Sequence, residues 1–183
     1  MEVDDQHLKN LTSIDEGMLR EVMEQYGEDV WNYAYFLTSK HDWADDIAQE
    51  VFIKVYKHIG GFRREASLKT WLLKLTRNTA FSYKRLAFFR KMSPVALESV
   101  VRVGPSAETE YWQRDFADAI WGHVLCLPVK FREALILSAH YEMSHDEIAE
   151  ALGISPGTVK SRLHRARRKL AELVRRERHD SFV

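Results

Sequence analysis

Residues 143–170 read MSHDEIAEALGISPGTVKSRLHRARRKL, and this stretch decides the fold of the C-terminal half of the chain. Ser144 followed by Glu147 is the S-x-x-E pattern of a capping box, which predicts that a helix begins here. Gly153 suits the left-handed backbone that ends a helix. Pro156, preceded by a serine, fits the first turn of a second helix. The stretch therefore predicts two helices joined by a turn of a few residues.

The second predicted helix separates apolar from basic side chains. Its inward positions are Val159, Leu163, Ala166 and Leu170. Such a pair of helices, the second one basic outside, is typical of a helix-turn-helix, whose second helix enters the major groove of DNA. Near its start, four residues are candidates for reading bases: Thr158, Lys160, Ser161 and Arg162. Three more, further along, are candidates for holding phosphates: Arg165, Arg168 and Lys169.

The rest of the chain is also patterned for helices. Apolar residues recur at three- and four-residue steps, which predicts helices over about 17–40, 42–59 and 68–89. The pattern lapses from Met92 to Ala107, where Pro and Gly appear, and resumes at about Glu108. We therefore expect an all-α protein of two small helical domains joined by a flexible linker. The expected divisions are 13–91, 92–107 and 108–183.

Charge is strongly segregated although the 183-residue chain is formally neutral. Residues 1–50 sum to −10, residues 51–91 to +10 and residues 158–183 to +6. Segregation on this scale indicates two basic surfaces for phosphates and an acidic one for another partner. Ordinary solvated helix faces are the alternative, and charge alone does not separate the two interpretations.

An acidic ridge lies within the segment 45–56. Asp46 and Glu50 are four residues apart and share a helix face, as do Asp45 and Gln49. No cation inside the domain is an obvious partner, so the ridge suits a basic partner surface. Paired carboxylates also suggest a metal site, as in a recombinase. We expect no metal, cofactor or enzymatic activity, because no His, Cys or nucleophile motif accompanies them.

Basic and aromatic amino-acid residues alternate after residue 62. This composition suits single-stranded nucleic acid, because bases stack on aromatic rings while phosphates pair with cations. A core role is the alternative for the aromatic and leucine side chains. The candidate contacts are Arg63, Arg64, Lys69, Trp71, Arg77, Asn78, Lys84 and Arg85.

Taken together, these segments resemble the extracytoplasmic-function sigma factors of the sigma-70 family. The resemblance is carried by residues 45–56, 69–72, 77–78 and 157–167, in the family's order and spacing. It implies that this protein binds core RNA polymerase through the β′ clamp and the β subunit of the enzyme. The residues that the resemblance assigns to this contact are Asp45, Asp46, Gln49 and Glu50. It further implies that the segment after residue 62 melts and holds the minus-ten promoter element. The helix-turn-helix would read the minus-thirty-five element in duplex DNA, and an anti-sigma factor is an implied partner.

One departure concerns the minus-ten segment. The family commonly has an aspartate after the Arg77-Asn78 pair, and Phe81-Ser82 stands in that region here. The details of minus-ten recognition are therefore open. The alternative function is a stand-alone helix-turn-helix regulator that binds duplex DNA without polymerase.

The remaining features predict a cytoplasmic protein. No apolar run approaches the roughly 20 residues that span a bilayer, so no direct membrane insertion is expected. The polar N-terminus does not resemble a secretory signal. The single cysteine, Cys126, is expected to be a small buried hydrophobe in a reducing compartment.

Overall fold

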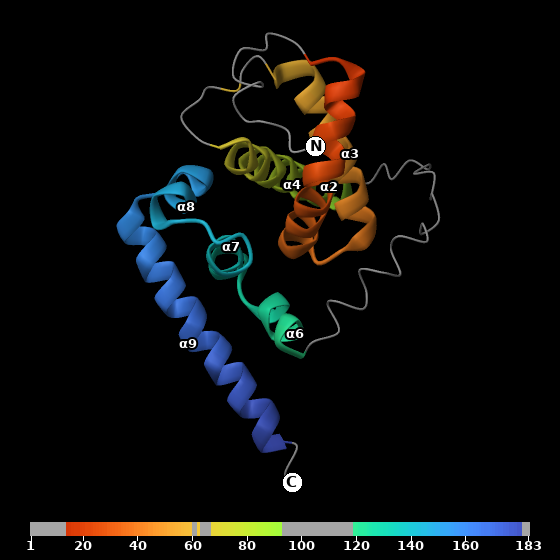
Figure 1. Ribbon diagram of the computed structural model, residues 1–183. Helices are drawn as coiled ribbons and strands as arrows, with labels where there is room; N and C mark the ends of the chain where they lie inside the picture. Colours follow the sequence, from red (N-terminus) through yellow and green to blue (C-terminus); the bar gives the residue numbers. More distant parts are fainter. Residues whose placement is uncertain (1–13, 60–61, 63–66, 93–118, 181–183) are drawn as a thin grey trace.

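The computed structural model describes residues 14–59, 62, 67–92 and 119–180 (Figure 1). Within those ranges the chain forms seven helices and no strand, which confirms the prediction of an all-α fold. Three helices belong to the N-terminal half and four to the C-terminal half. The expected linker beyond Met92, and the helical start expected at Glu108, lie outside the described residues.

The N-terminal unit consists of α2 (Glu16–Thr38), α3 (His41–His58) and α4 (Leu68–Met92). Asp15 caps α2, and its carboxylate accepts a hydrogen bond from the Met18 amide at 2.8 Å. The helix ends at Ser39, whose φ of 58° is left-handed. That backbone turn allows α3 to fold back against α2.

The apolar stripes of the three helices meet in one core, as their periodicity predicts. Its largest fully buried side chains include Tyr33, Phe36, Leu37, Ile47, Leu68, Leu72 and Leu73. Burying each such side chain contributes about 1.5–3 kcal/mol relative to leaving it exposed. The packing of α2 against α3 and α4 therefore supports the surfaces that these helices present outward.

The C-terminal unit consists of α6 (Ala119–Cys126), α7 (Val129–Ala139), α8 (His145–Leu152) and α9 (Pro156–Asp180). The capping box predicted at the start of α8 is present in both directions. Its hydrogen bonds from the Ser144 side chain and backbone lower the pKa of Glu147. Gly153 ends α8 with φ 64°, as predicted. The helix-turn-helix is thus confirmed as a backbone arrangement.

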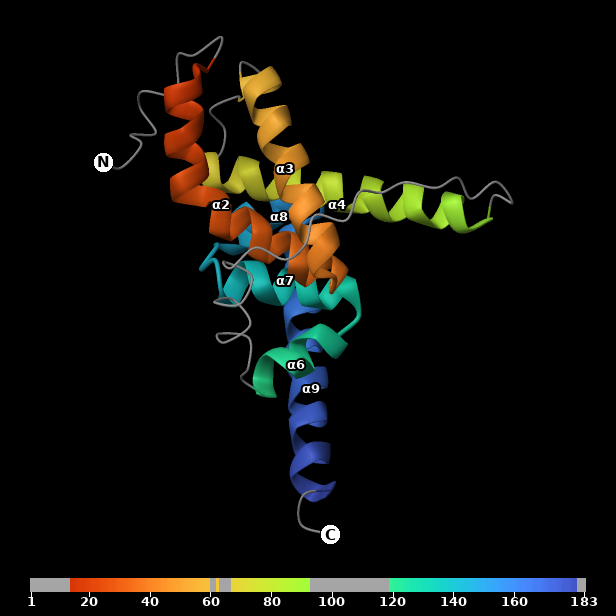
Figure 2. The same ribbon diagram turned by 90° about the vertical axis from the view of Figure 1, so that its right-hand side faces the viewer.

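The two units touch each other. Contacts join α2 to α7 and α4 to α8, so that α7 lies between the N-terminal bundle and α9 (Figures 1 and 2). The long helix α9 runs past α7 and α6 and ends away from the bundle. The seam between α7 and α2 is therefore where residues far apart in the sequence meet.

Two details bear on the sequence interpretation. Cys126 is exposed, so the prediction of a buried thiol was wrong. It lies two positions after buried Val124 and one before buried Leu127, and residues three apart share a helix face whereas Cys126 falls off it. None of the described helices has the length and apolar character needed to cross a bilayer.

Candidate nucleic-acid and protein interfaces

The outer face of α9 carries most of the residues proposed to meet duplex DNA. Ser155 starts this helix, because its hydroxyl accepts a hydrogen bond from the Thr158 amide at 3.2 Å. Val159, Leu163 and Ala166 are buried and fix the rotation of the helix. Five predicted contacts consequently point to solvent: Lys160, Ser161, Arg165, Arg168 and Lys169. This face can approach a phosphate backbone without moving α9.

Arg162 lies differently from its neighbours on α9. Its side chain is only 22% exposed, and its Nη1 atom binds Oε1 of Glu133 at 2.9 Å. Glu133 lies on α7 and is buried. A half-buried arginine on a buried carboxylate is held inside the molecule, so Arg162 does not share the outward position expected from the sequence.

The N-terminal surface proposed for the minus-ten element also combines exposed residues with an arginine that is held by Glu133. Asn78 and Arg85 are exposed on α4. Arg77 is 22% exposed, and its Nε atom binds Oε2 of Glu133 at 3.0 Å. Its guanidinium also lies 4.8 Å from the centre of the Phe81 ring. One carboxylate on α7 therefore joins a predicted DNA contact from each unit.

The other candidate DNA contacts on or before α4 either contact residues of the protein itself or lie outside the residues that the structure describes. The Lys69 ammonium binds the Asp29 carboxylate at 2.9 Å and lies over the Tyr141 ring. Lys84 donates to the Leu37 carbonyl, and burial lowers its pKa. Trp71 is partly buried against the core. Arg63 and Arg64 lie outside the described residues.

The acidic ridge on α3 is exposed. Asp45, Asp46, Gln49 and Glu50 all face solvent. The expectation that the ridge has no internal cation was wrong for Glu50, which binds Lys54 at 3.0 Å. Because Lys54 is one turn further along the same helix, this is a local surface pair that contributes about 0.3–0.5 kcal/mol. Such a pair leaves Glu50 accessible to a partner.

Two aromatic side chains from neighbouring helices hold the ridge in place. The Trp31 indole of α2 donates to the Asp45 carboxylate at 2.6 Å, and the Tyr83 hydroxyl of α4 donates to Asp46. The sequence analysis did not assign these two residues. Their amphipathic side chains could have suggested such a role, since Trp and Tyr combine an apolar ring with a polar N–H or O–H group. Their hydrogen-bond partners could not be predicted, because these lie on a different helix.

The seam between the units is rich in directional contacts. Arg132, on α7, is 7% exposed. Its guanidinium donates hydrogen bonds to the Phe36 carbonyl at 2.7 Å and to Ser39 Oγ at 2.8 Å. The Tyr141 hydroxyl donates to the Asp29 carbonyl at 2.7 Å. Phe36 packs against Trp121 with ring centres 5.2 Å apart. These contacts attach the C-terminal unit to α2.

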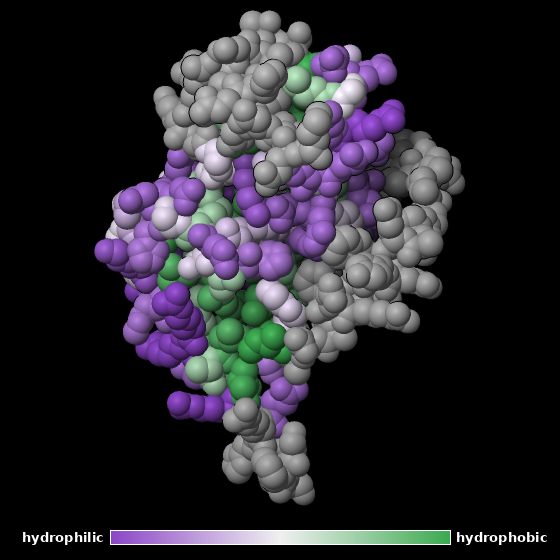
Figure 3. Space-filling model, viewed as in Figure 1, coloured by the Kyte–Doolittle hydropathy of each residue, from purple (hydrophilic) through white to green (hydrophobic). Residues whose placement is uncertain are grey.

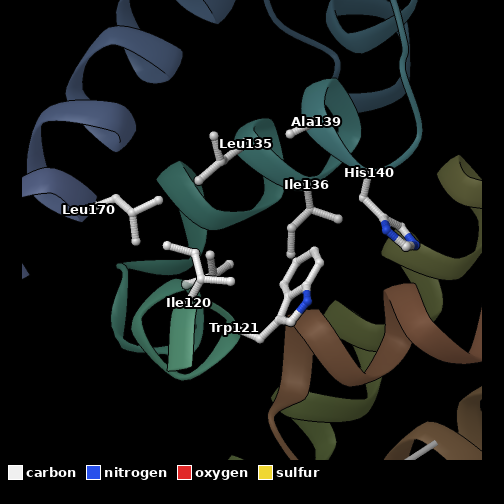
Figure 4. Close-up of a pocket in the computed structure, with 8 residues that line it drawn as sticks. Ile120, Trp121, Leu135, Ile136, Ala139, His140 and Leu170 are labelled. Carbon is white, nitrogen blue, oxygen red and sulfur yellow. The ribbon is translucent and has the colours of Figure 1, made fainter. Parts of the chain in front are cut away.

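An apolar pocket opens beside the seam. Figure 4 shows it between Ile120 and Trp121 of α6, residues of α7, and Leu170 of α9. Its volume is about 170 Å³, and His140 is the only lining residue with a polar side-chain tip apart from the Trp121 indole. Ile120 is 43% exposed, and an apolar patch is visible over this part of the molecule in Figure 3.

A metal site finds no support in the part of the chain that the structure describes, where no three His, Cys, Asp or Glu side chains gather suitably. The carboxylates of the acidic ridge instead accept hydrogen bonds or pair with lysine. Those carboxylates are therefore engaged in intramolecular contacts at the protein surface.

Comparison with known proteins identifies both units. Residues 22–87 match the family model of Sigma-70 region 2, and residues 120–170 match that of Sigma-70, region 4. The RNA polymerase sigma factor SigZ of Bacillus subtilis is 31% identical over 156 residues, covering 85% of this chain and 86% of SigZ. The ECF RNA polymerase sigma factor SigW of the same bacterium is 27% identical over 177 residues, covering 92% and 95%.

Solved structures show the same fold. The sigma factor RpoE in complex with the anti-sigma factor NepR from Bartonella quintana matches with a TM-score of 0.67 and 27% identity, over 85% of this chain and 96% of that one. CnrH, in complex with the cytosolic domain of CnrY, shares the fold with a TM-score of 0.63 at 19% identity, over 93% and 94%. This chain belongs to the sigma-70 family of RNA polymerase sigma factors, in its extracytoplasmic-function (ECF) group.

Proposed function

We propose that this protein binds core RNA polymerase and directs it to promoters by recognising a minus-ten and a minus-thirty-five element. One observation carries the proposal: a single chain combines an exposed acidic ridge on α3 with a helix-turn-helix whose second helix is basic outside. Family membership supports the same role. The protein acts by binding and contributes no reaction of its own.

The acidic ridge is the proposed contact with polymerase. Asp45 and Asp46 accept hydrogen bonds from α2 and α4, so their carboxylates are oriented before a partner arrives. Preorganised charges of one sign speed encounter with a surface of opposite sign and fix its register. A basic surface on the β′ clamp is the partner that this chemistry fits.

The DNA contacts are divided between the two units. On α9, Lys160 and Ser161 lie near the N-terminal end that meets base edges, whereas Arg165, Arg168 and Lys169 suit phosphates. On α4, Asn78 and Arg85 are exposed and Arg77 lies beside them. Residues 13–91 and 108–183 are the proposed domains, joined through 92–107. A sigma factor works where promoters and polymerase are, so we propose a cytoplasmic location.

An anti-sigma factor is a further proposed partner. Two structural relatives are described in complexes, RpoE with the anti-sigma factor NepR and CnrH with a domain of CnrY. The pocket beside Trp121 offers an apolar lining and an exposed Ile120 at its edge. An apolar side chain of a partner helix would fill it. Replacing Ile120 with Glu should then weaken that partner's binding and leave the helical content unchanged.

Run-off transcription tests the function directly. Purified bacterial core polymerase is mixed with genomic fragments, with and without this protein. Discrete transcripts that require the protein are expected, and their start sites define the promoter. If no transcript forms while the protein alone shifts duplex DNA, it is a stand-alone regulator and the polymerase-binding proposal is refuted.

A further inference from the structure

Phe81 is an aromatic residue on the surface of α4. A core role was the alternative interpretation of the aromatic residues in this segment, and it is wrong for Phe81, which is 38% exposed and lies outside the apolar core. Leu86, further along the same helix, is 59% exposed. Figure 2 shows the C-terminal part of α4 extending past the other helices. This part of α4 therefore offers apolar surface to solvent.

Contacts on the inner side of α4 fix which residues face outward. The Lys54 ammonium donates to the Thr79 hydroxyl at 3.1 Å, and Ala80 is buried. The Tyr83 hydroxyl donates to Asp46. Residues three, four and seven positions apart share a helix face. The outward set with this spacing, which we call the aromatic face of α4, consists of four exposed residues: Asn78, Phe81, Ser82 and Arg85.

The Phe81 ring is held from one side by Arg77. The Arg77 guanidinium lies 4.8 Å from the centre of the ring, where a cation is attracted to the aromatic face. Its Nε atom binds Glu133 at 3.0 Å, and the Glu133 side chain is only 2% exposed. Moving the guanidinium away would leave a buried carboxylate with one partner fewer, which is costly. The ring is therefore supported in one position while part of its surface stays open to solvent.

The charge around the aromatic face favours a polyanion. The sequence of α4, residues 68–92, contains no Asp or Glu. Arg85 lies on the face itself, and Lys74 lies one turn before Asn78. Basic side chains without any acid among them attract phosphates. Nucleic acid thus fits this face better than an apolar protein surface does.

An exposed ring among basic and amide side chains suits an unpaired base. In duplex DNA each base is covered by its neighbours in the stack, whereas a base of a melted strand can stack on an aromatic ring. Phe81-Ser82 is also the stretch in which this chain departs from the family, which commonly has an aspartate in this region. A carboxylate here would repel the phosphates of a strand, and the neutral Ser82 does not.

We infer that Phe81 stacks on an unpaired base of the displaced strand at the minus-ten element. Asn78 supplies an amide for the edge of a base, and Arg85 pairs with a phosphate. Stacking on a ring tolerates every base, so Phe81 distinguishes melted from duplex DNA, while Asn78 contributes sequence preference. The inference rests on the proposed function, because that function supplies the melted strand.

Phe81→Leu tests the stacking. Leucine keeps an apolar side chain, is a good helix former and has no ring. Core polymerase carrying each variant is titrated into a labelled single strand with the non-template sequence of a minus-ten element mapped by run-off transcription. Fluorescence anisotropy should show about tenfold weaker binding for Phe81→Leu, because a stacked base is lost. Affinity for the duplex of the same sequence should stay within about twofold of wild type.

Phe81→Tyr is the matched control, since it changes the same position and retains the ring. Its affinity for the single strand should stay within about twofold of wild type. A second readout is the fluorescence of 2-aminopurine, which stacking quenches, placed at one position of the strand at a time. One position should be brighter with Phe81→Leu than with wild type or Phe81→Tyr. Circular dichroism should show equal helical content for all three proteins.

Three outcomes would overturn the inference. Equal single-strand affinities for Phe81→Leu and Phe81→Tyr would mean that the ring stacks on no base. An equal loss on duplex and single strand would make Phe81 a duplex contact. Weaker binding of Phe81→Leu to core polymerase, with the single-strand affinity unchanged, would make the aromatic face a protein contact.

Failure of the proposed function is distinguishable from failure of this inference. In the first case the wild-type protein yields no transcripts, and the melted strand on which the inference rests is removed with it. In the second case the wild-type protein supports transcription, yet Phe81→Leu and Phe81→Tyr bind the single strand equally well.

Discussion

The proposed polymerase-binding surface and the proposed DNA-binding surfaces of this sigma factor differ in how accessible their side chains are. On α3 the four ridge residues face solvent, and their internal partners orient them without covering them. On α4 and α9, Arg77 and Arg162 are held by a buried carboxylate. Because Glu133 belongs to the C-terminal unit, separation of the two units would release Arg77 and leave the Arg162 ion pair in place. The comparison predicts an order of events, in which polymerase binds the molecule with its units in contact and promoter DNA reaches Arg77 after the units separate.

The largest effect should come from reversing charge on the ridge. The double variant Asp46→Lys and Glu50→Lys should lower the affinity for core polymerase by at least about a thousandfold, because like charges facing each other cost several kcal/mol. Binding is measured by fluorescence anisotropy with labelled sigma factor. Glu21→Lys with Glu24→Lys is the matched control, since both residues are exposed on α2. Equal affinities for the two variants would contradict the docking assignment.

The next effect concerns the apolar core that anchors α9. Leu163 is 2% exposed on the inner face of α9. Leu163→Ala should lower the free energy of unfolding by about 2–5 kcal/mol, measured in urea. Leu86→Ala, at a position 59% exposed, should cost less than about 0.5 kcal/mol. A loss at Leu163 no larger than at Leu86 would mean that α9 is not anchored by this core.

Exposed and held arginines should respond differently to substitution. In the free protein, Arg165→Ala should weaken duplex binding across sequences and reduce the slope of log affinity against log salt by about 1, because one phosphate contact is lost. Arg162→Gln should have a smaller effect on the free protein, since Arg162 is held by Glu133. Because Arg162 and Glu133 belong to the same unit, the effect of Arg162→Gln should stay small with polymerase bound. Equal effects of the two variants on duplex binding would contradict the conclusion that the Glu133 ion pair holds Arg162 away from DNA.

The smallest effect should be a pH dependence of closure, the state in which the two units are in contact. His140 packs between Trp121 and Tyr141 at the seam and keeps part of its ring exposed to solvent. Burial of the rest of the ring lowers the pKa of His140, with Asp29 opposing this change and Lys69 adding to it. The open form, with the ring hydrated, therefore binds a proton more readily. Closure is then fully present above the ordinary pKa of about 6.5 and is lost as pH falls through the lowered value.

Small-angle scattering between about pH 8 and about pH 5.5 measures this effect. The radius of gyration should grow as the pH falls, because protonation of the His140 imidazole favours the open form. His140→Gln should flatten the dependence, whereas His145→Gln, at an exposed position on α8, should preserve it. A pH profile that His140→Gln leaves unchanged would exclude this imidazole as its source.

Local signals in the sequence predicted most of the fold. The Ser144–Glu147 capping box, Gly153 and the proline at 156 defined the helix-turn-helix, because each acts within a few residues. The seam could not be predicted in this way. It depends on Glu133 meeting Arg77, which is 56 positions away, and on Arg132 meeting Phe36, 96 positions away. The spacing of residues along one helix does not predict partners that are so distant in the sequence.

The same limit applies to the candidate site. Periodicity placed Arg165 and Arg168 on the outer face of α9 correctly, because the inner face is set by Val159 and Leu163. Arg162 shares that helix but reaches Glu133 with its long side chain. Exposure of a flexible arginine depends on which acids come within reach after folding, and that is decided by α7.

The order of events is tested most directly by energy transfer between the two units. One dye is attached to the exposed native thiol of Cys126, on α6, and the other to Glu24→Cys, an exposed position on α2. Adding core polymerase without DNA should lower the transfer efficiency, because the units separate before promoter binding. If the efficiency stays that of the free protein while the labelled protein supports transcription, separation is not needed and the account is wrong.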